Sequence, residues 1–137
     1  MELNYQELSN EIIERLEGIR QIALATCAGD RVFARTVSPV NDGLTIYFST
    51  GGNSEKARQL GSNPNVALAI ENIQIEATAE SIGHPSKHPH YTTQYPPGSD
   101  DIVVIIKPTK ITLYKFLGKA CEEVLDIENG QAYRTEL

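Results

Sequence analysis

Apolar residues recur every three or four positions near the start of the chain, and they gather in short runs from residue 22 onward. Leu8, Ile12 and Leu16 follow the helical period, which predicts an amphipathic helix over 1–18 that ends at Gly18. The later runs are rich in β-branched residues and are separated by turn-forming residues, which is typical of strands. We therefore expect one N-terminal helix packed on a mainly β fold.

Seven segments have the length and composition of strands. They are 22–27, 32–40, 44–49, 66–70, 74–82, 102–106 and 110–117. Turn sequences at 28–31 and 41–43 join the first three of them as hairpins, and Pro39 near the end of the second indicates an edge or a bulge. Closely spaced strands with few helices predict an antiparallel barrel of six or seven strands.

A second, shorter helix is predicted between the third and fourth strands. The run 54–60 has helical composition, with Asn53 or Ser54 as its N-cap, and Gly61 ends it.

The remaining stretches are predicted to be irregular. Residues 83–101 have no regular period, which predicts a long loop, and 118–137 is predicted to be a C-terminal tail. No internal repeat or second domain boundary is found. A chain of 137 residues then fits a single domain, 1–137, with one core.

Charge and composition narrow the possible partners. The net charge of −6 and the pI of about 5.0 argue against nucleic acid, which binds to basic surfaces. No apolar run is long enough to span a bilayer and no signal peptide is recognised, so we expect a soluble cytoplasmic protein. A small phosphorylated ligand remains possible, because it needs only a local cluster of cations and N–H donors.

One stretch has the composition of a phosphate site. Arg35 and Lys56 flank a segment that contains Ser49, Thr50 and Ser54, and the second predicted helix begins there. Helix N-termini attract anions through unpaired N–H groups, and cationic side chains strengthen that attraction. The alternative is that Ser54 is only an N-cap and that the two cations are ordinary surface charges. The local pattern leaves both interpretations open.

Six short motifs in chain order resemble one known family. They are Ile-Ala-Leu-Ala-Thr at 22–26, Arg-Thr-Val at 35–37, Tyr-Phe-Ser-Thr at 47–50, Ser-Glu-Lys-Ala at 54–57, Asn-Pro-Asn-Val-Ala at 63–67 and Glu-Ala-Thr-Ala at 76–79. In this order they are similar to the pyridoxamine 5'-phosphate oxidase-like family of FMN-binding split barrels. The resemblance covers about 22–82 well and the last two predicted strands loosely.

The resemblance implies a mainly β fold with flanking helices, specifically a six-stranded antiparallel split β-barrel. It also implies FMN as the cofactor and a homodimer with the flavin at its interface. The residues that it places at the FMN phosphate are Arg35, Lys56, Ser49 and Ser54. Those that it places along the flavin ring are Thr36, Val37, Ser38 and Thr50, with Asn72 or Gln74 reaching the ring bound by the other subunit.

Departures from the family pattern limit the expected activity. Residues 131–137 lack the Arg- and Pro-containing signature of the vitamin B6 oxidases, so that activity is not expected. Tryptophan is absent, which leaves Tyr47 or Tyr95 to pack on the flavin. We expect an FMN-dependent oxidoreductase that passes electrons from a reduced nicotinamide to a small acceptor, with no catalytic side chain assigned. The alternative is a non-catalytic FMN- or haem-binding module, such as a stress-response protein.

The long loop contains the three histidines of the chain. His84, His88 and His90 lie close in sequence to Asp100 and Asp101, a set that could ligate a metal. Their spacing is irregular and no cysteine is nearby, so no metal is expected. The same loop, with its tyrosines at 91 and 95, could act as a lid over the flavin or be a disordered excursion.

Overall fold

The computed structural model describes residues 1–88 and 97–137. In these ranges the chain forms two α-helices, one short 3-10 helix and nine strands. In chain order they are α1 (Tyr5–Glu17), β1 (Ile22–Ala28), β2 (Arg31–Val37), β3 (Val40–Asp42), β4 (Thr45–Gly51), α2 (Glu55–Ser62), β5 (Asn65–Ile70), β6 (Ile73–Gly83), η1 (Pro85–Lys87), β7 (Asp101–Phe116), β8 (Ala120–Asp126) and β9 (Gln131–Glu136).

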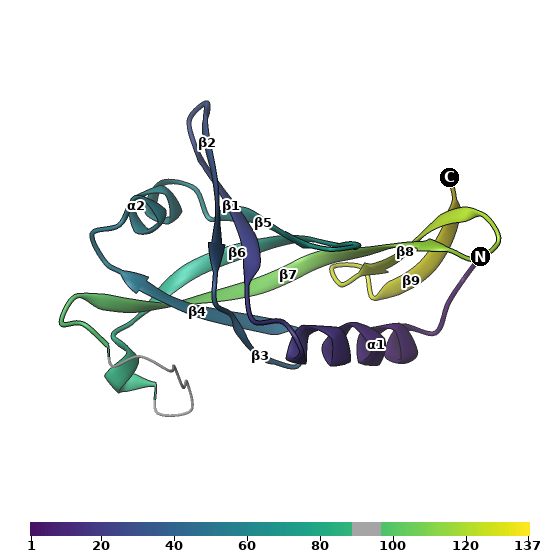
Figure 1. The fold of residues 1–137 in the computed structure, drawn as a ribbon, viewed down its shortest axis with the longest axis horizontal. Helices are drawn as coiled ribbons and strands as arrows, with labels where there is room; N and C mark the ends of the chain where they lie inside the picture. The colour runs from purple at the N-terminus through teal and green to yellow at the C-terminus, as the bar shows by residue number, and fades with distance from the viewer. Residues whose placement is uncertain (89–96) are drawn as a thin grey trace.

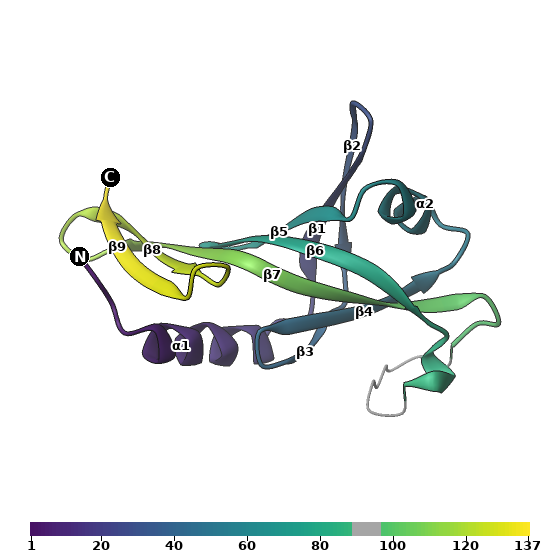
Figure 2. The ribbon, with the colours of Figure 1, turned by 180° about the vertical axis from the view of Figure 1, so that it is seen from behind.

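The strands form one antiparallel sheet in the order β2-β1-β5-β6-β7-β4-β3. The 16-residue strand β7 connects the two ends of the molecule: its first part pairs with β4 and its last part pairs with β8, which in turn pairs with β9. Figures 1 and 2 show the β6–β7 ribbon running along the molecule, with the β1–β2 hairpin and α2 near one end and both termini near the other. In the described part of the chain, β2 has a sheet neighbour on one side only.

Alternation along the strands places one set of side chains in a shared core. In β1 the side chains of Ile22, Leu24 and Thr26 are buried, and Ile12 and Leu16 of α1 join the same interior. Full burial of an aliphatic side chain of this size stabilises a fold by about 1.5–3 kcal/mol. The core therefore fixes the faces of β1 and its neighbours, and with them the direction in which polar residues point.

The mainly β, antiparallel class is confirmed, but the number and limits of the strands differ from the prediction. The predicted strand 32–40 is divided, because β2 ends at Val37 and β3 begins at Val40, with Pro39 between them. The two strands predicted on either side of Pro108 are one strand, β7. A register shift lies opposite Pro108, between Glu76 and Ala77 of β6, and such a bulge accommodates a residue that has no N–H to donate.

The predicted C-terminal tail, 118–137, is the largest difference. It forms the β8–β9 hairpin, which pairs with the last part of β7 and contributes Val124, Leu125 and Ala132 to the buried residues. Alternation is weak in this stretch because three consecutive residues of β8, from Glu123 to Leu125, are buried. The predicted total of six strands is therefore too low.

The two predicted hairpin turns are confirmed. Gly43 has a φ of 61° and closes the turn between β3 and β4, in which Asp42 pairs with Thr45. A positive φ of this size favours glycine, which explains the Asn-Asp-Gly sequence there. Among the helices described, none combines the length and the apolar character that a membrane crossing would need.

Candidate anion-binding site

A close turn at the end of β4 sets the position of α2. The Gly52 N–H donates to the Asp100 carbonyl oxygen at 2.8 Å, and the Ser54 N–H donates to the Gly51 carbonyl oxygen at 3.1 Å. A Cβ on Gly52 would lie 2.7 Å from the Asp100 oxygen, so only glycine fits this contact. The turn thus brings the beginning of α2 against the end of β4.

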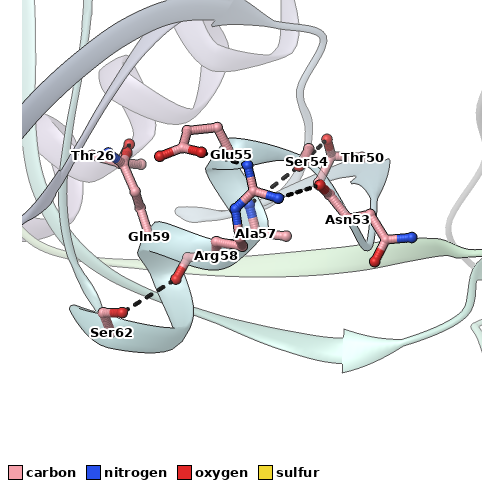
Figure 3. Close-up of polar contacts among 9 residues, drawn as sticks. All are labelled: Thr26, Thr50, Asn53, Ser54, Glu55, Ala57, Arg58, Gln59 and Ser62. Atoms are coloured by element: carbon pink, nitrogen blue, oxygen red, sulfur yellow. Dashed lines mark hydrogen bonds and ion pairs between the residues drawn. The ribbon is translucent and has the colours of Figure 1, made fainter.

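Ser54 is the N-cap of α2, which settles the choice left open between Asn53 and Ser54. Its Oγ accepts from the Ala57 N–H at 3.2 Å and lies 3.3 Å from the Thr50 Oγ1 (Figure 3). The other N–H groups of a first helical turn have no intrahelical acceptor and carry a partial positive charge. Two hydroxyls and a helix N-terminus therefore lie together.

Arg35 approaches this region from β2. Its Nη1 donates to the Thr26 Oγ1 at 2.7 Å and makes longer contacts with the carbonyl oxygens of Leu24 and Phe33, at 3.4 and 3.5 Å. Within the described ranges, the Nε and Nη2 groups of Arg35 make no hydrogen bond. One edge of the guanidinium is therefore held by the protein, and the other donors remain for a ligand.

Lys56 lies in the first turn of α2 and is half-buried. Burial and, after it, the positive charge of Arg35 lower the pKa of Lys56. Burial also lowers the pKa of Arg35, against the opposing effect of Glu55. Across 1–88 and 97–137, Lys56 forms no ion pair with a carboxylate. Two like charges thus interact unfavourably, and a bound anion would relieve this repulsion.

Further cations surround this pair. Arg31 and Arg35 both lie over the ring of Phe33, with guanidinium carbons 5.3 and 5.7 Å from its centroid. Arg58 donates to the Glu55 carboxylate at 2.5 Å, and this bond lowers the pKa of Glu55, with smaller contributions from the charges of Arg58, Arg31 and Arg35. A locally positive surface therefore exists on a protein whose net charge is −6.

The predicted phosphate residues are not all placed together. Thr50, Ser54 and Lys56 meet at the beginning of α2, and Arg35 is close enough to affect the pKa of Lys56. Ser49 precedes Thr50 on β4, so alternation directs its side chain to the opposite face.

Three of the residues predicted to lie along the flavin ring are at the end of β2 and just after it, and the fourth, Thr50, is on β4 beside Ser54. Thr36 and Ser38 are exposed, and Val37 is buried at 8% exposure.

Asn72 and Gln74 have different surroundings. The Asn72 Nδ2 donates to the Tyr114 carbonyl oxygen at 2.8 Å, and its Oδ1 accepts from Arg15 at 2.9 Å. Gln74 is exposed, and the only hydrogen bond of its side chain among the described residues is a long one, 3.5 Å, from the Tyr114 hydroxyl. Of the two, Gln74 has the side chain that is available to a ligand.

An apolar groove of about 340 Å³ lies on the outer face of the sheet. Small side chains from β1, β2 and β5 form most of its surface, and polar side chains from β6 and β7 border it. The lining residues are Ala23, Ala25, Ala34, Ala67, Leu68, Ala69, Gln74, Ile75, Glu76 and Thr112. Alternation along β2 places Thr36 on the same face as Ala34, whereas Arg35 points to the other face.

The histidines that the structure describes are used in local contacts. The His84 Nδ1 lies 2.9 Å from the Ser86 Oγ and its Nε2 lies 2.9 Å from the Gly98 carbonyl oxygen, while the His88 Nε2 lies 2.6 Å from the Ile82 carbonyl oxygen. Within the described ranges no three His, Cys, Asp or Glu side chains are grouped as metal ligands. His90, Tyr91 and Tyr95 lie outside those ranges, as does the middle of the predicted lid.

Two buried polar residues next to Arg35 were not recognised from the sequence. Thr26 and Gln59 are 1% and 3% exposed and hydrogen-bond to each other. In the sequence, Thr26 is the last residue of the Ile-Ala-Leu-Ala-Thr motif, and nothing there indicates its contact with Arg35. Gln59 lies three positions after Lys56 in the second helix, and a polar residue there gives no sign of being buried. Its burial depends on β1 lying against α2, and no local pattern gives that information.

The chain is similar to known proteins in sequence and in fold. The family model for pyridoxamine 5'-phosphate oxidase matches residues 8–115. General stress protein 26 of Bacillus subtilis (strain 168) is 29% identical over 68 residues, which are 50% of this chain and 49% of that protein. The match therefore spans about half of that relative's length.

Two solved structures share the fold over nearly the whole chain. A protein related to general stress protein 26 from Clostridium acetobutylicum has a TM-score of 0.69 at 14% identity, covering 98% of this chain and 97% of that one. A pyridoxamine 5'-phosphate oxidase-related, FMN-binding protein from Nostoc punctiforme PCC 73102 has a TM-score of 0.66 at 12% identity, covering 100% and 99%. The predicted split-barrel class is thereby confirmed. Since the family model extends over most of the sequence, the chain belongs to the pyridoxamine 5'-phosphate oxidase family.

Proposed function

We propose that this protein binds FMN and that Arg35, Lys56 and the beginning of α2 hold the FMN phosphate. We also propose that the protein acts as an oxidoreductase with the bound flavin as its redox group. The observation that carries the proposal is the pair of neighbouring cations, of which Lys56 has no carboxylate partner in the described ranges. A phosphate dianion supplies the missing negative charge, and charge-assisted bonds to it are worth about 1.5–3 kcal/mol each.

The position of β2 supports the proposed course of the flavin ring. Arg35 and Thr36 point to opposite faces of β2, and no described strand pairs with the outer edge of β2. A ligand that passes around this edge can keep its phosphate on the Arg35 side and lay its ring along the backbone from Thr36 to Ser38. Free N–H and C=O groups of an edge strand then face the polar edge of the ring.

A homodimer is the second part of the proposal. The alanine-lined groove includes Ala34, on the face of β2 that also bears Thr36, and has Gln74 on its border. A second copy seated on this face would cover the apolar surface and enclose the ring side of the flavin. Gln74, with its available amide, is then the side chain that reaches the flavin bound by the other subunit.

The protein's part in the chemistry would be binding and orientation. When bound, FMN supplies reversible electron uptake. Arg35, Lys56 and the N-cap region anchor the phosphate, the edge of β2 orients the ring, and the dimer face excludes water. We propose a reduced nicotinamide as the electron donor and a small molecule as the acceptor.

A comparison of two flavins tests the phosphate site. Riboflavin has the ring of FMN without its phosphate, so binding of both to the apoprotein, followed by flavin fluorescence, isolates the phosphate contribution. Arg35→Ala should weaken FMN binding by about 10- to 100-fold and leave riboflavin binding unchanged. Lys119→Ala, which removes an exposed cation at the β7–β8 turn, is the matched control. An unchanged FMN-to-riboflavin ratio in Arg35→Ala would place the phosphate elsewhere.

Anaerobic addition of NADH or NADPH tests the oxidoreductase. Bleaching of the flavin absorption band supports electron transfer. A bound flavin that neither nicotinamide reduces favours the non-catalytic binding module.

The mass in solution tests the dimer. We expect twice the chain mass at micromolar concentration, and Ala67→Arg, which puts a charge in the groove, should shift the protein to the monomer. A monomeric wild-type protein contradicts this part of the proposal.

A further inference from the structure

A chain of two hydrogen bonds connects Arg35 to α2. The Arg35 Nη1 donates to the Thr26 Oγ1 at 2.7 Å, and the Thr26 hydroxyl donates to the Gln59 Oε1. Figure 3 shows the Gln59 side chain extending from α2 to Thr26 on β1. Three elements that are separate in the sequence, β2, β1 and α2, thus meet at one hydroxyl.

The direction of this chain follows from its atoms. A guanidinium only donates and an amide oxygen only accepts, so the Thr26 hydroxyl accepts a hydrogen bond from Arg35 and donates one to Gln59. The Thr26–Gln59 bond is buried, with the two residues 1% and 3% exposed, and the Arg35–Thr26 bond is partly buried. In such surroundings each bond is electrostatically stronger, and an unpaired partner is costly.

The bond to Thr26 restricts the Arg35 side chain. Arg35 lies opposite Leu24 in the β1–β2 pairing, and Thr26 is two residues further along the same face of β1. The guanidinium therefore leans along the strand, and its Nη1 is held while Nε and Nη2 remain available. Without Thr26, a long side chain on an edge strand would lose this restraint, and binding would then have to immobilise it.

Gln59 connects the same restraint to Lys56. The two residues are three positions apart on α2, so one helical turn separates the buried amide from the second cation. The contacts of Thr26 and Gln59 therefore help to set the distance between the Arg35 and Lys56 side chains.

We propose that Thr26 and Gln59 are positioning residues for the phosphate of the bound flavin: they fix the Arg35 guanidinium and its distance from the beginning of α2. This inference rests on the proposed function, because it assigns a role within the same site. Neither residue is expected to touch the ligand, and their effect on binding passes through Arg35.

Thr26→Val tests the inference, since valine keeps the shape of threonine and lacks the hydroxyl. We expect it to weaken FMN binding by about three- to tenfold, the cost of immobilising one long side chain on binding, with riboflavin binding unchanged. Thr26→Ser keeps the hydroxyl and should stay within about twofold of wild type. In an Arg35→Ala background, Thr26→Val should have no further effect on FMN binding, because Thr26 acts on binding only through the Arg35 guanidinium.

The outcomes separate this inference from the function on which it rests. If Arg35→Ala leaves the FMN-to-riboflavin ratio unchanged, the phosphate site itself is wrong. If Arg35→Ala lowers that ratio and Thr26→Val does not, only the positioning role is wrong. An equal loss of FMN and riboflavin binding in Thr26→Val shows a structural role alone and also overturns the inference. Should Thr26→Val not fold, Gln59→Met, which removes the acceptor at similar size, is judged by the same ratio.

Discussion

Positively charged side chains gather at two places in this protein, near opposite ends of the sheet, and their surroundings differ. At the β8–β9 end, Lys115 and Arg134 share the buried carboxylate of Glu123, each at 2.6 Å, and Lys115 also pairs with Glu11 of α1 at 2.7 Å. At the α2 end, Arg35 is held by a neutral hydroxyl, and Lys56 has no carboxylate partner in the described ranges.

The pKa directions express the same contrast. Burial would lower the pKa of Lys115, but its bonds to Glu11 and Glu123 raise it overall. For Lys56 both burial and the charge of Arg35 lower the pKa. The first cluster is complete within the chain and joins α1, β7, β8 and β9. In the second cluster, Lys56 has no carboxylate partner among the described residues, and the anion proposed above would supply the negative charge.

Of the substitutions that test this contrast, we expect one at Glu123 to have the largest effect, a loss of stability. Glu123→Ala leaves two partly buried cations without their shared carboxylate, and we expect the free energy of unfolding to fall by about 3 kcal/mol in urea denaturation. Glu136→Ala removes one partner of the exposed Lys119–Glu136 pair, 3.7 Å apart, and should change it by less than about 1 kcal/mol. Equal effects of the two substitutions would contradict the scaffold role.

The pH dependence of stability sharpens the same point. Burial raises the pKa of Glu123, but the bonds from Lys115 and Arg134 outweigh it and bring the pKa below its ordinary value of 4.5. The carboxylate therefore stabilises the fold above pH 4.5, and this contribution is lost as the pH falls through the native pKa. Glu123→Gln should be less stable than wild type at neutral pH and lose less on acidification. Parallel unfolding curves for the two proteins would show that Glu123 does not contribute.

A smaller effect is expected at the α2 end, where Glu55 interacts with Arg58, Arg31 and Arg35. Glu55→Gln removes a charge that repels a phosphate, and FMN should bind about threefold more tightly at low salt. High salt should reduce the difference, since exposed charges are screened. Glu128→Gln, in the β8–β9 turn, serves as the control. Weaker FMN binding in Glu55→Gln would place the phosphate away from these arginines.

Local signals explain what was predicted well. The Asn-Asp-Gly turn, the ending of α1 at Gly18 and the cap at Ser54 each depend on a few neighbouring residues. The first two were recognised, and the cap was narrowed to Asn53 or Ser54. The joint position of Lys56, Thr50 and Ser54 was also recognised, because a strand-turn-helix sequence brings these residues together without help from the rest of the fold.

Contacts that are distant in sequence explain what was missed. Asn72, one of the two amides predicted to reach the flavin of the other subunit, hydrogen-bonds to Arg15 and Tyr114, 57 and 42 positions away, and neither contact was foreseen. The β8–β9 hairpin was missed because its pairing partner is the far end of β7 and its buried Glu123 breaks the apolar pattern. The Thr26–Gln59 bond spans 33 residues, and only the packing of α2 on β1 brings the two side chains into contact.

The open edge of β2 has one more consequence, for solubility. A strand with unpaired N–H and C=O groups can pair with a strand of another molecule and begin aggregation, and Val32 at the end of this hairpin is 70% exposed. Arg31 and Arg35 put two like charges on that strand, and they repel the same strand of a second, ligand-free molecule. The arginines on β2, of which Arg35 is proposed to bind an anion, would therefore also hinder self-association of the ligand-free protein.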